Sequence, residues 1–467
     1  MRTVVSGGTV VCSDGSASID VLIEGETIAA TAAAGSQEAE RWLEGADKVI
    51  DATGRYVIPG GIDAHTHMEM PFGGTRSADT FETGTRAAAF GGTTTIIDFA
   101  IQQKGGSLLE GLDTWQEKAA RVSAIDYSFH AIVSDVNETS LKEMDVLVAQ
   151  GVTSFKLFMA YPGVFYATDK EIFKAMDRAA GNGALIMMHA ENGIAIDAIV
   201  EAALSRGETA PINHGLTRPA ELEGEAVSRA IRLAQVARAP LYIVHLSSKP
   251  ALDAVVEARD RGQNIFAETC PQYLFLSEDD MAREGFEGAK FVCTPPLRPR
   301  HNQAVLWQGL RDDDLSIVAT DHCPFCYKEQ KELGIGDFTK IPNGLPGVEH
   351  RLDLVHQGVL TGEITLERFV EVTSTAPAKM FGLYPKKGTI APGSDADIVV
   401  YDPAATHVLS ATTHHMAVDY SCYEGMEVTG AVETVLSRGR AVVERSVYKG
   451  APGRGRFVPR QLCRSLR

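Results

Sequence analysis

Short apolar runs alternate with longer stretches of helical periodicity between residues 57 and 383. Eight runs have the length of buried strands: Val57-Ile58 leading to Gly60-Gly61, then 93–100, 127–133, 154–160, 184–189, 241–245, 264–269 and 317–320. Between them, segments such as 169–180 and 223–237 place apolar residues at helical spacing. Eight strands separated by helices predict an α/β fold, a (β/α)8 TIM-type barrel, with a doubly wound open sheet as the competing architecture.

Both ends of the chain contain short β-type runs instead. They lie at 3–11 and 18–29, and again at 398–401, 430–436 and 441–447, with turn signals such as Gly7-Gly8 and Pro392-Gly393 between them. We therefore expect a small β-sandwich domain built from both termini. Residues 1–56 and 384–447 form it, residues 57–383 form the catalytic barrel, and the basic residues 448–467 form a solvated, partly disordered tail.

Histidines and an aspartate stand at the C-terminal ends of the predicted strands. His65 and His67 follow the first run, His189 ends the fifth, His245 ends the sixth and Asp321 follows the eighth. Residues two apart in an extended segment point to the same side, so His65 and His67 can reach one cation. Catalytic residues from different strands converge at the C-terminal rim of a barrel, whereas an open sheet could not gather them. The set favours the barrel and predicts a metal centre.

Lys156 lies within the fourth predicted strand, between the metal-binding strands. An ammonium among metal ligands would repel cations, and burial drives it toward the neutral amine. A neutral amine can add carbon dioxide and become a carbamate whose two oxygens can bridge two metals. The alternative is a lysine at the barrel wall that is paired with an acid. We expect N6-carboxylated Lys156.

Composition and charge narrow the functional class. The net charge of −17 argues against a nucleic-acid partner. Seven cysteines without framework spacing favour a reducing compartment, and Cys323 and Cys326 alone are a weak zinc signal. No apolar run approaches the roughly 20 residues that span a bilayer. We expect a cytoplasmic protein that does not interact with membranes.

Several motifs resemble the cyclic amidohydrolases of the hydantoinase and dihydropyrimidinase family. They are Gly60-Gly61-Ile62-Asp63-Ala64-His65-Thr66-His67, Phe155-Lys156-Leu157-Phe158-Met159-Ala160-Tyr161, His189-Ala190-Glu191-Asn192, His245-Leu246-Ser247, Glu268-Thr269-Cys270-Pro271 and Asp321-His322-Cys323-Pro324-Phe325. The loop Met70-Pro71-Phe72-Gly73-Gly74-Thr75 is more similar to bacterial D-hydantoinases than to animal dihydropyrimidinases. The resemblance covers the barrel and extends to Asp419-Tyr420 and Glu424-Gly425-Met426.

The resemblance implies two divalent metal ions, usually zinc. His65, His67 and Asp321 would bind the first ion, His189 and His245 the second, and carboxylated Lys156 would bridge them. The family is commonly tetrameric, so a homotetramer is expected.

The resemblance also implies the residues that contact substrate. Tyr161 matches a tyrosine that stabilises the oxyanion, and Asn343 and Thr294 match contacts to the ring amide. Thr294 stands where many relatives have serine, but that contact uses mainly backbone atoms. Phe72, Phe158 and Phe165 fall where the family gates the pocket for the exocyclic substituent, although packing under surface loops explains Phe165 equally well.

These roles imply hydrolytic ring opening. Two cations lower the pKa of a bridging water, which attacks the ring carbonyl, and Asp321 carries the proton to the leaving nitrogen. The predicted substrates are 5-substituted hydantoins or dihydropyrimidines, and the products are N-carbamoyl amino acids. Two alternatives stay open: an allantoinase-like ring-opening hydrolase, or a non-catalytic scaffold protein that resembles dihydropyrimidinases. Dihydroorotase is disfavoured because no cationic clamp is evident near Met70-Pro71-Phe72.

Overall fold

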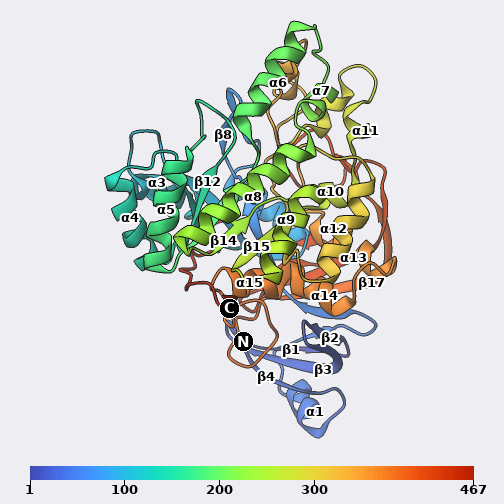
Figure 1. Cartoon of the computed structure of the whole chain (residues 1–467). Helices are drawn as coiled ribbons and strands as arrows, with labels where there is room; N and C mark the ends of the chain where they lie inside the picture. The colour runs from blue at the N-terminus through green and yellow to red at the C-terminus, as the bar shows by residue number, and fades with distance from the viewer. Residues whose placement is uncertain (467) are drawn as a thin grey trace.

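Eight parallel strands curl into a barrel in the computed structural model, which describes residues 1–466 (Figure 1). They pair in chain order: β7 (Gly61–Thr66), β10 (Thr93–Ile101), β11 (Asp126–Ile132), β12 (Ser154–Phe158), β13 (Leu185–His189), β14 (Leu241–Ile243), β15 (Ile265–Thr269) and β16 (Ile317–Val318). The ring closes where Thr66 bridges His322 and the His67 N–H donates to the His322 carbonyl over 2.8 Å. The predicted barrel is therefore confirmed.

Helices cover the outside of this barrel. They are α2 (Phe81–Phe90), α3 (Leu108–Ala119), α4 (Glu138–Ala149), α5 (Asp169–Asn182), α8 (Ala220–Ala237), α9 (Lys249–Asp260), α12 (His301–Arg311) and α13 (Arg351–Leu360). Capping boxes at Thr80, Asn137 and Thr168 start α2, α4 and α5. All residues of β7 and of β10 to β16 are buried, because helices cover one face and the barrel interior fills the other.

Shorter elements decorate the rim and the connections. They are the hairpin β8 (Pro71–Phe72) and β9 (Thr75–Arg76), and helices α6 (Gly193–Ser205), α7 (Ile212–Leu216), α10 (Pro271–Phe275), α11 (Glu278–Met281), α14 (Leu366–Val370) and α15 (Ala376–Met380). Short 3-10 helices cover Glu287–Phe291, Lys331–Gly334 and Phe338–Lys340, and a π-helical turn covers Glu371–Thr375. Among residues 1–466, no helix has both the length and the apolarity to cross a membrane.

The small domain is one ten-stranded sheet that uses both ends of the chain. Its strands are β1 (Arg2–Ser6), β2 (Thr9–Cys12), β3 (Gly15–Glu24), β4 (Thr27–Ala33), β5 (Lys48–Asp51), β6 (Tyr56–Pro59), β17 (Ile398–Val408), β18 (Glu427–Ser437), β19 (Arg440–Glu444) and β20 (Val447–Tyr448). Val5, Val21 and Val57 pack with Ile398 and Leu436 in one core, so early and late strands face each other. Helix α1 (Gln37–Glu44) packs Trp42 against Val4 and Leu22.

The first barrel strand is not the predicted run at Val57-Ile58. That run is β6, which pairs antiparallel with β17 and parallel with β2 in the small domain. The barrel strand is β7, and the chain changes sheets at Gly60. A Cβ at Gly60 would collide with the Thr94 side chain, so glycine permits this close passage. Two apolar strands separated by one glycine look like a single run in the sequence.

Part of the C-terminal segment packs against the barrel, although most of its described residues are exposed. The Arg460 side chain is only 4% exposed, and its Nε donates to Ser128 Oγ at 3.0 Å. Its backbone N–H donates to the Gly151 carbonyl at 2.9 Å, and Phe457 bridges Tyr127. The expectation of a solvated tail does not hold at Arg460, because hydroxyl and carbonyl oxygens of the barrel accept hydrogen bonds from Nε and Nη2 of this guanidinium.

Candidate metal centre

His65, His67 and Asp321 converge at the rim of the barrel. One Asp321 oxygen, Oδ1, lies 3.0 Å from His65 Nε2 and 3.2 Å from His67 Nε2. His245 joins them, since ligand atoms of His65, His245 and Asp321 all lie within 4.8 Å of one another. Imidazole nitrogens and a carboxylate oxygen at this spacing fit a divalent cation.

Protonation suits metal binding at His67, His245 and Asp321. Burial lowers the pKa of His67 to about 3 and the pKa of His245 well below its ordinary value, so both rings are neutral. Burial opposes ionisation of Asp321, but His65 and His67 hold the pKa of this carboxyl well below its usual range. Neutral imidazoles and an ionised carboxylate are the forms that ligate metals.

His189 and His245 form a second pair of imidazoles beside the first cluster, and their ring centroids are 4.6 Å apart. His189 Nε2 contacts Glu191 Oε2 at 2.8 Å, which fixes the orientation of the ring. Within residues 1–466, the buried Nδ1 atoms of His245 and His67 have no hydrogen-bond partner. Unsatisfied buried nitrogens are costly, and a cation beside His245 would satisfy such an atom, whereas His67 faces the cluster through Nε2.

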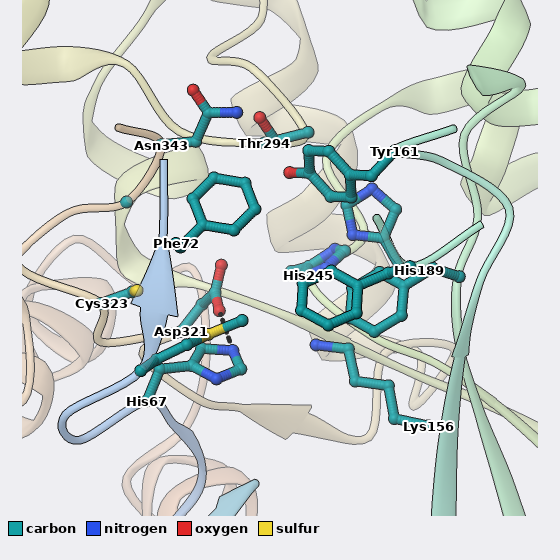
Figure 2. Close-up of a pocket in the computed structure, with 14 residues that line it drawn as sticks. His67, Phe72, Lys156, Tyr161, His189, His245, Thr294, Asp321, Cys323 and Asn343 are labelled. Carbon is teal, nitrogen blue, oxygen red and sulfur yellow. Dashed lines mark ion pairs between the residues drawn. The ribbon is translucent and has the colours of Figure 1, made fainter. Parts of the chain in front are cut away.

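Lys156 projects between the two imidazole groups (Figure 2). Its Nζ lies 2.9 Å from His65 Nε2 and is flanked by the rings of Phe99 and Phe158, at 4.3 and 5.0 Å. No carboxylate in the described chain lies within 4 Å of this ammonium, and burial lowers the pKa of Lys156 to about 8. This environment differs from that of an acid-paired lysine at the barrel wall, and it increases the fraction of the amine that is neutral near neutral pH.

Three residues of the site have backbone conformations that are rare outside glycine. Tyr161, His245 and Asp321 have φ angles of +62°, +40° and +52°. Such conformations cost of order 1–3 kcal/mol and persist where the surrounding structure enforces them, often at functional sites. The strain therefore coincides with the side chains that converge on the pocket.

Two carboxylates that orient the imidazoles, Glu268 and Glu191, were not predicted as site residues from the sequence. Glu268 contacts His65 Nδ1, accepts the Tyr242 hydroxyl at 2.7 Å and accepts the His245 N–H at 3.1 Å. Glu191 supports His189 in the same way. A buried acid at the end of the predicted strand 264–269 was the available signal for Glu268, because metal-binding histidines commonly donate their second nitrogen to a carboxylate.

The pocket above these residues has a polar wall and an apolar wall. Tyr161, Thr294 and Asn343 lie along its upper edge (Figure 2). Burial raises the pKa of Tyr161, so its hydroxyl is a neutral donor. The apolar wall contains the predicted gating residues Phe72, Phe158 and Phe165, together with Met70.

The three phenylalanines make different contacts. Phe165 is 7% exposed and stacks on Phe158 with ring centroids 5.0 Å apart, while it also lines the pocket. Phe72 meets Tyr161 edge to face at 5.3 Å. Packing and lining the pocket are therefore compatible for Phe165.

Other polar residues singled out in the sequence have structural partners. His130 Nε2 donates to the Ala64 carbonyl at 3.0 Å and its Nδ1 contacts Ser154 Oγ, while His322 Nε2 lies 3.0 Å from Asp79 Oδ2. Cys323 and Cys326 are free thiols, and Cys323 lines the pocket. Both histidines therefore have structural partners within the barrel.

Comparison with known proteins gives a consistent result. Residues 56–442 match the amidohydrolase family. The chain is 64% identical to a D-hydantoinase of Streptomyces coelicolor, over 100% of this chain and 99% of that protein. It is similar to the crystal structure of dihydropyrimidinase from Brevibacillus agri (TM-score 0.96, 49% identity, 99% of each chain covered). It is also similar to L-hydantoinase from Arthrobacter aurescens (TM-score 0.88, 31% identity, 98% and 99% covered).

Proposed function

The chain belongs to the amidohydrolase family, and on that premise we propose that it hydrolyses a cyclic amide bond. The substrates are 5-substituted hydantoins or dihydropyrimidines, and the products are N-carbamoyl amino acids. The observation that carries the proposal is the convergence of His65, His67, His245 and Asp321 beneath a pocket with one polar and one aromatic wall. Relatives named for these reactions match this chain over nearly its whole length.

The two walls of the pocket match the two sides of such a ring. Asn343 and Thr294 face the site from loops on the polar side and would hold the ring amide. Phe72, Phe158 and Phe165 offer an apolar surface to the substituent on C5. A neutral aryl or alkyl group fits such a surface better than a carboxylate, because an anion would be desolvated without a partner.

We assign the cation ligands according to the clusters described above. His65, His67 and Asp321 would hold one divalent ion, His189 and His245 the other, and carboxylated Lys156 would bridge them. When bound, such ions supply Lewis acidity and lower the pKa of water at the site. Zinc is the expected metal, although nitrogen and oxygen ligands accept several divalent ions.

The side chains of the protein move the proton and stabilise the charge. Asp321 accepts a proton from the water that attacks the ring carbonyl and returns it to the ring nitrogen as the C–N bond breaks. The Tyr161 hydroxyl donates to the oxyanion of the tetrahedral intermediate. Asn343 and Thr294 hold the ring amide so that its carbonyl carbon faces the water. One water is consumed, a C–O bond replaces the C–N bond, and the ring opens.

Carboxylation of Lys156 is supported by the absence of an acid partner within 4 Å among residues 1–466 and by the lowered pKa of its amine. Intact mass spectrometry under non-acidic conditions should show a gain of one carbon dioxide, which acidification removes. A bare amine in protein that contains two metals per chain would contradict this assignment.

Cytoplasmic localisation and the oligomeric state stay predictions. The seven cysteines are all free thiols, which is typical of proteins in a reducing compartment such as the cytoplasm. A homotetramer is expected from the family resemblance, and sedimentation or light scattering would measure it.

The test is ring-opening activity of metal-replete protein on hydantoin, 5-phenylhydantoin, dihydrouracil, allantoin and dihydroorotate. Preference for 5-substituted hydantoins or dihydrouracil is the expected result. Preference for allantoin would establish the alternative ring-opening hydrolase. Absence of both turnover and stoichiometric metal would instead identify a non-catalytic scaffold.

A further inference from the structure

A second fully buried lysine lies behind the polar wall of the pocket. Lys331 begins the turn Lys331–Gly334, and its side chain is 0% exposed. Its Nζ donates to three backbone carbonyls: Val292 at 2.9 Å, Pro342 at 2.7 Å and Gly344 at 2.9 Å. An ammonium has three N–H groups, so these carbonyls use its full donor capacity.

These carbonyls belong to the two segments that carry the proposed ring-amide contacts. Val292 precedes Thr294 by two residues, while Pro342 and Gly344 flank Asn343 on both sides. The Val292 carbonyl also accepts the Gly344 N–H at 3.0 Å. Lys331 therefore joins the two loops at a shared oxygen and holds the backbone on either side of Asn343. We call this arrangement the lysine clasp.

No carboxylate in the described chain lies within 4 Å of Lys331 to compensate its charge. The titratable groups that face it are the thiols of Cys293, Cys323 and Cys422 and the imidazole of His214. Burial raises the pKa of each thiol and lowers that of His214, so all four are neutral. Burial likewise lowers the pKa of Lys331 to about 7. An uncompensated buried cation costs stability, and an apolar side chain would fill the same volume at lower cost.

We propose that Lys331 is a positioning residue that sets the spacing of the Thr294 and Asn343 loops and thereby the affinity for the ring amide. The inference rests on the proposed function, because it concerns the same pocket. Lys331 does not line that pocket and acts only through backbone carbonyls. Its loss should weaken substrate binding more than it slows the chemical step, because the metal ligands and Asp321 belong to other segments.

The decisive variant is Lys331→Met, which keeps the apolar stem and removes all three donors. We expect KM for the preferred cyclic substrate to rise about 10- to 100-fold, while kcat changes less than about 3-fold. The metal content should equal that of the wild type. Lys331→Gln retains two donors and should recover part of the loss in KM; it also carries the test if the methionine variant does not fold.

Lys387→Met is the matched control, because it removes another buried ammonium with three acceptors, at the base of the barrel. This control should lower stability and leave KM unchanged. Wild-type KM in folded Lys331→Met, or in Lys331→Gln if the methionine variant does not fold, would reduce Lys331 to a packing role and overturn the inference alone. A wild-type enzyme that opens no cyclic amide would overturn the proposed function itself.

Discussion

Each end of the barrel contains a buried lysine, and the surroundings of the two lysines shift their pKa values in opposite directions. At the base, Lys387 Nζ lies 2.8 Å from Asp126, 3.1 Å from Asp395 and 2.6 Å from Asp397. Burial opposes its charge, yet the three carboxylates outweigh burial and raise the pKa of Lys387. At the rim, Lys156 has a histidine nitrogen at 2.9 Å and no carboxylate within 4 Å among residues 1–466, and its pKa falls to about 8.

This difference indicates that the network at the base stabilises the fold, whereas the rim carries the chemistry. The base network joins β11 of the barrel to the segment before β17 and therefore ties the two domains together. Its three carboxylates all contact Lys387, and Asp126 also contacts Arg438. The rim instead retains unsatisfied donors and acceptors, such as His245 Nδ1 and Glu191 Oε1, within the described chain. Buried polar atoms without partners lower the stability of the fold, and they are typical of sites that bind a ligand or an ion.

Asp321→Asn at the rim should have the largest effect, a loss of turnover without a loss of stability. The amide keeps the volume of the side chain but cannot accept and return the proton, so turnover should fall at least about 1,000-fold. The melting temperature should change little. Steady-state kinetics and calorimetry measure both quantities, and wild-type turnover would exclude Asp321 as the proton shuttle.

Lys156→Met should also remove activity while sparing the fold. Loss of the bridging ligand is expected to reduce bound metal below one ion per chain and turnover by at least about 100-fold. Stability of the metal-free protein should hold or rise, because a buried amine without an acid partner is replaced by an apolar group. Metal analysis and urea unfolding of metal-free protein distinguish this result from simple unfolding.

Lys387→Met should produce the opposite outcome at the base. Three buried carboxylates would lose their cation, which costs about 3–5 kcal/mol of unfolding free energy. Turnover per folded molecule should match the wild type. Urea unfolding measures the loss, and a variant with normal stability but reduced activity would show that the base is coupled to the chemistry.

Phe72→Ala should sharpen the distinction between the two walls of the pocket. Removal of the ring should lower kcat/KM for 5-phenylhydantoin by about 10- to 100-fold. Unsubstituted hydantoin has no group on this side, so its kcat/KM should change much less. Equal losses for both substrates would indicate that Phe72 supports Tyr161 rather than the substituent.

The smallest expected effect concerns pH and the lysine clasp. Lys331 has a pKa of about 7 in the folded protein, whereas an unfolded lysine titrates near 10.4. Between these values the unfolded chain binds more protons, so this residue makes stability rise with pH, by at most roughly 1.4 kcal/mol per pH unit. The stability of the wild type relative to Lys331→Met should therefore increase from pH 7 to 9. Urea unfolding of both proteins at each pH measures this difference. A flat or opposite trend would contradict the lowered pKa of Lys331.

Sequence patterns predicted the elements that depend on local periodicity. Strands such as 154–158 and 185–189 were expected because apolar runs of strand length mark them, and the predicted ligand His189 ends the second strand. The division at Gly60 was missed because sheet membership depends on β17, more than 300 residues away. Arg460 and Lys331 were misjudged or overlooked for the same reason. Their partners are backbone carbonyls and hydroxyls, which have no sequence signature.

Strand β6 has a consequence for the order of events during synthesis. It pairs with β2 from the beginning of the chain and with β17 from near the end. Roughly 390 residues separate β5 from the last residue of β18, so at about 5–20 residues per second the ribosome needs roughly 20–80 s to supply the missing strands. During that interval the apolar faces of β1 to β6 lack their partners. The nascent chain is therefore expected to need shielding at its start until its last strands emerge.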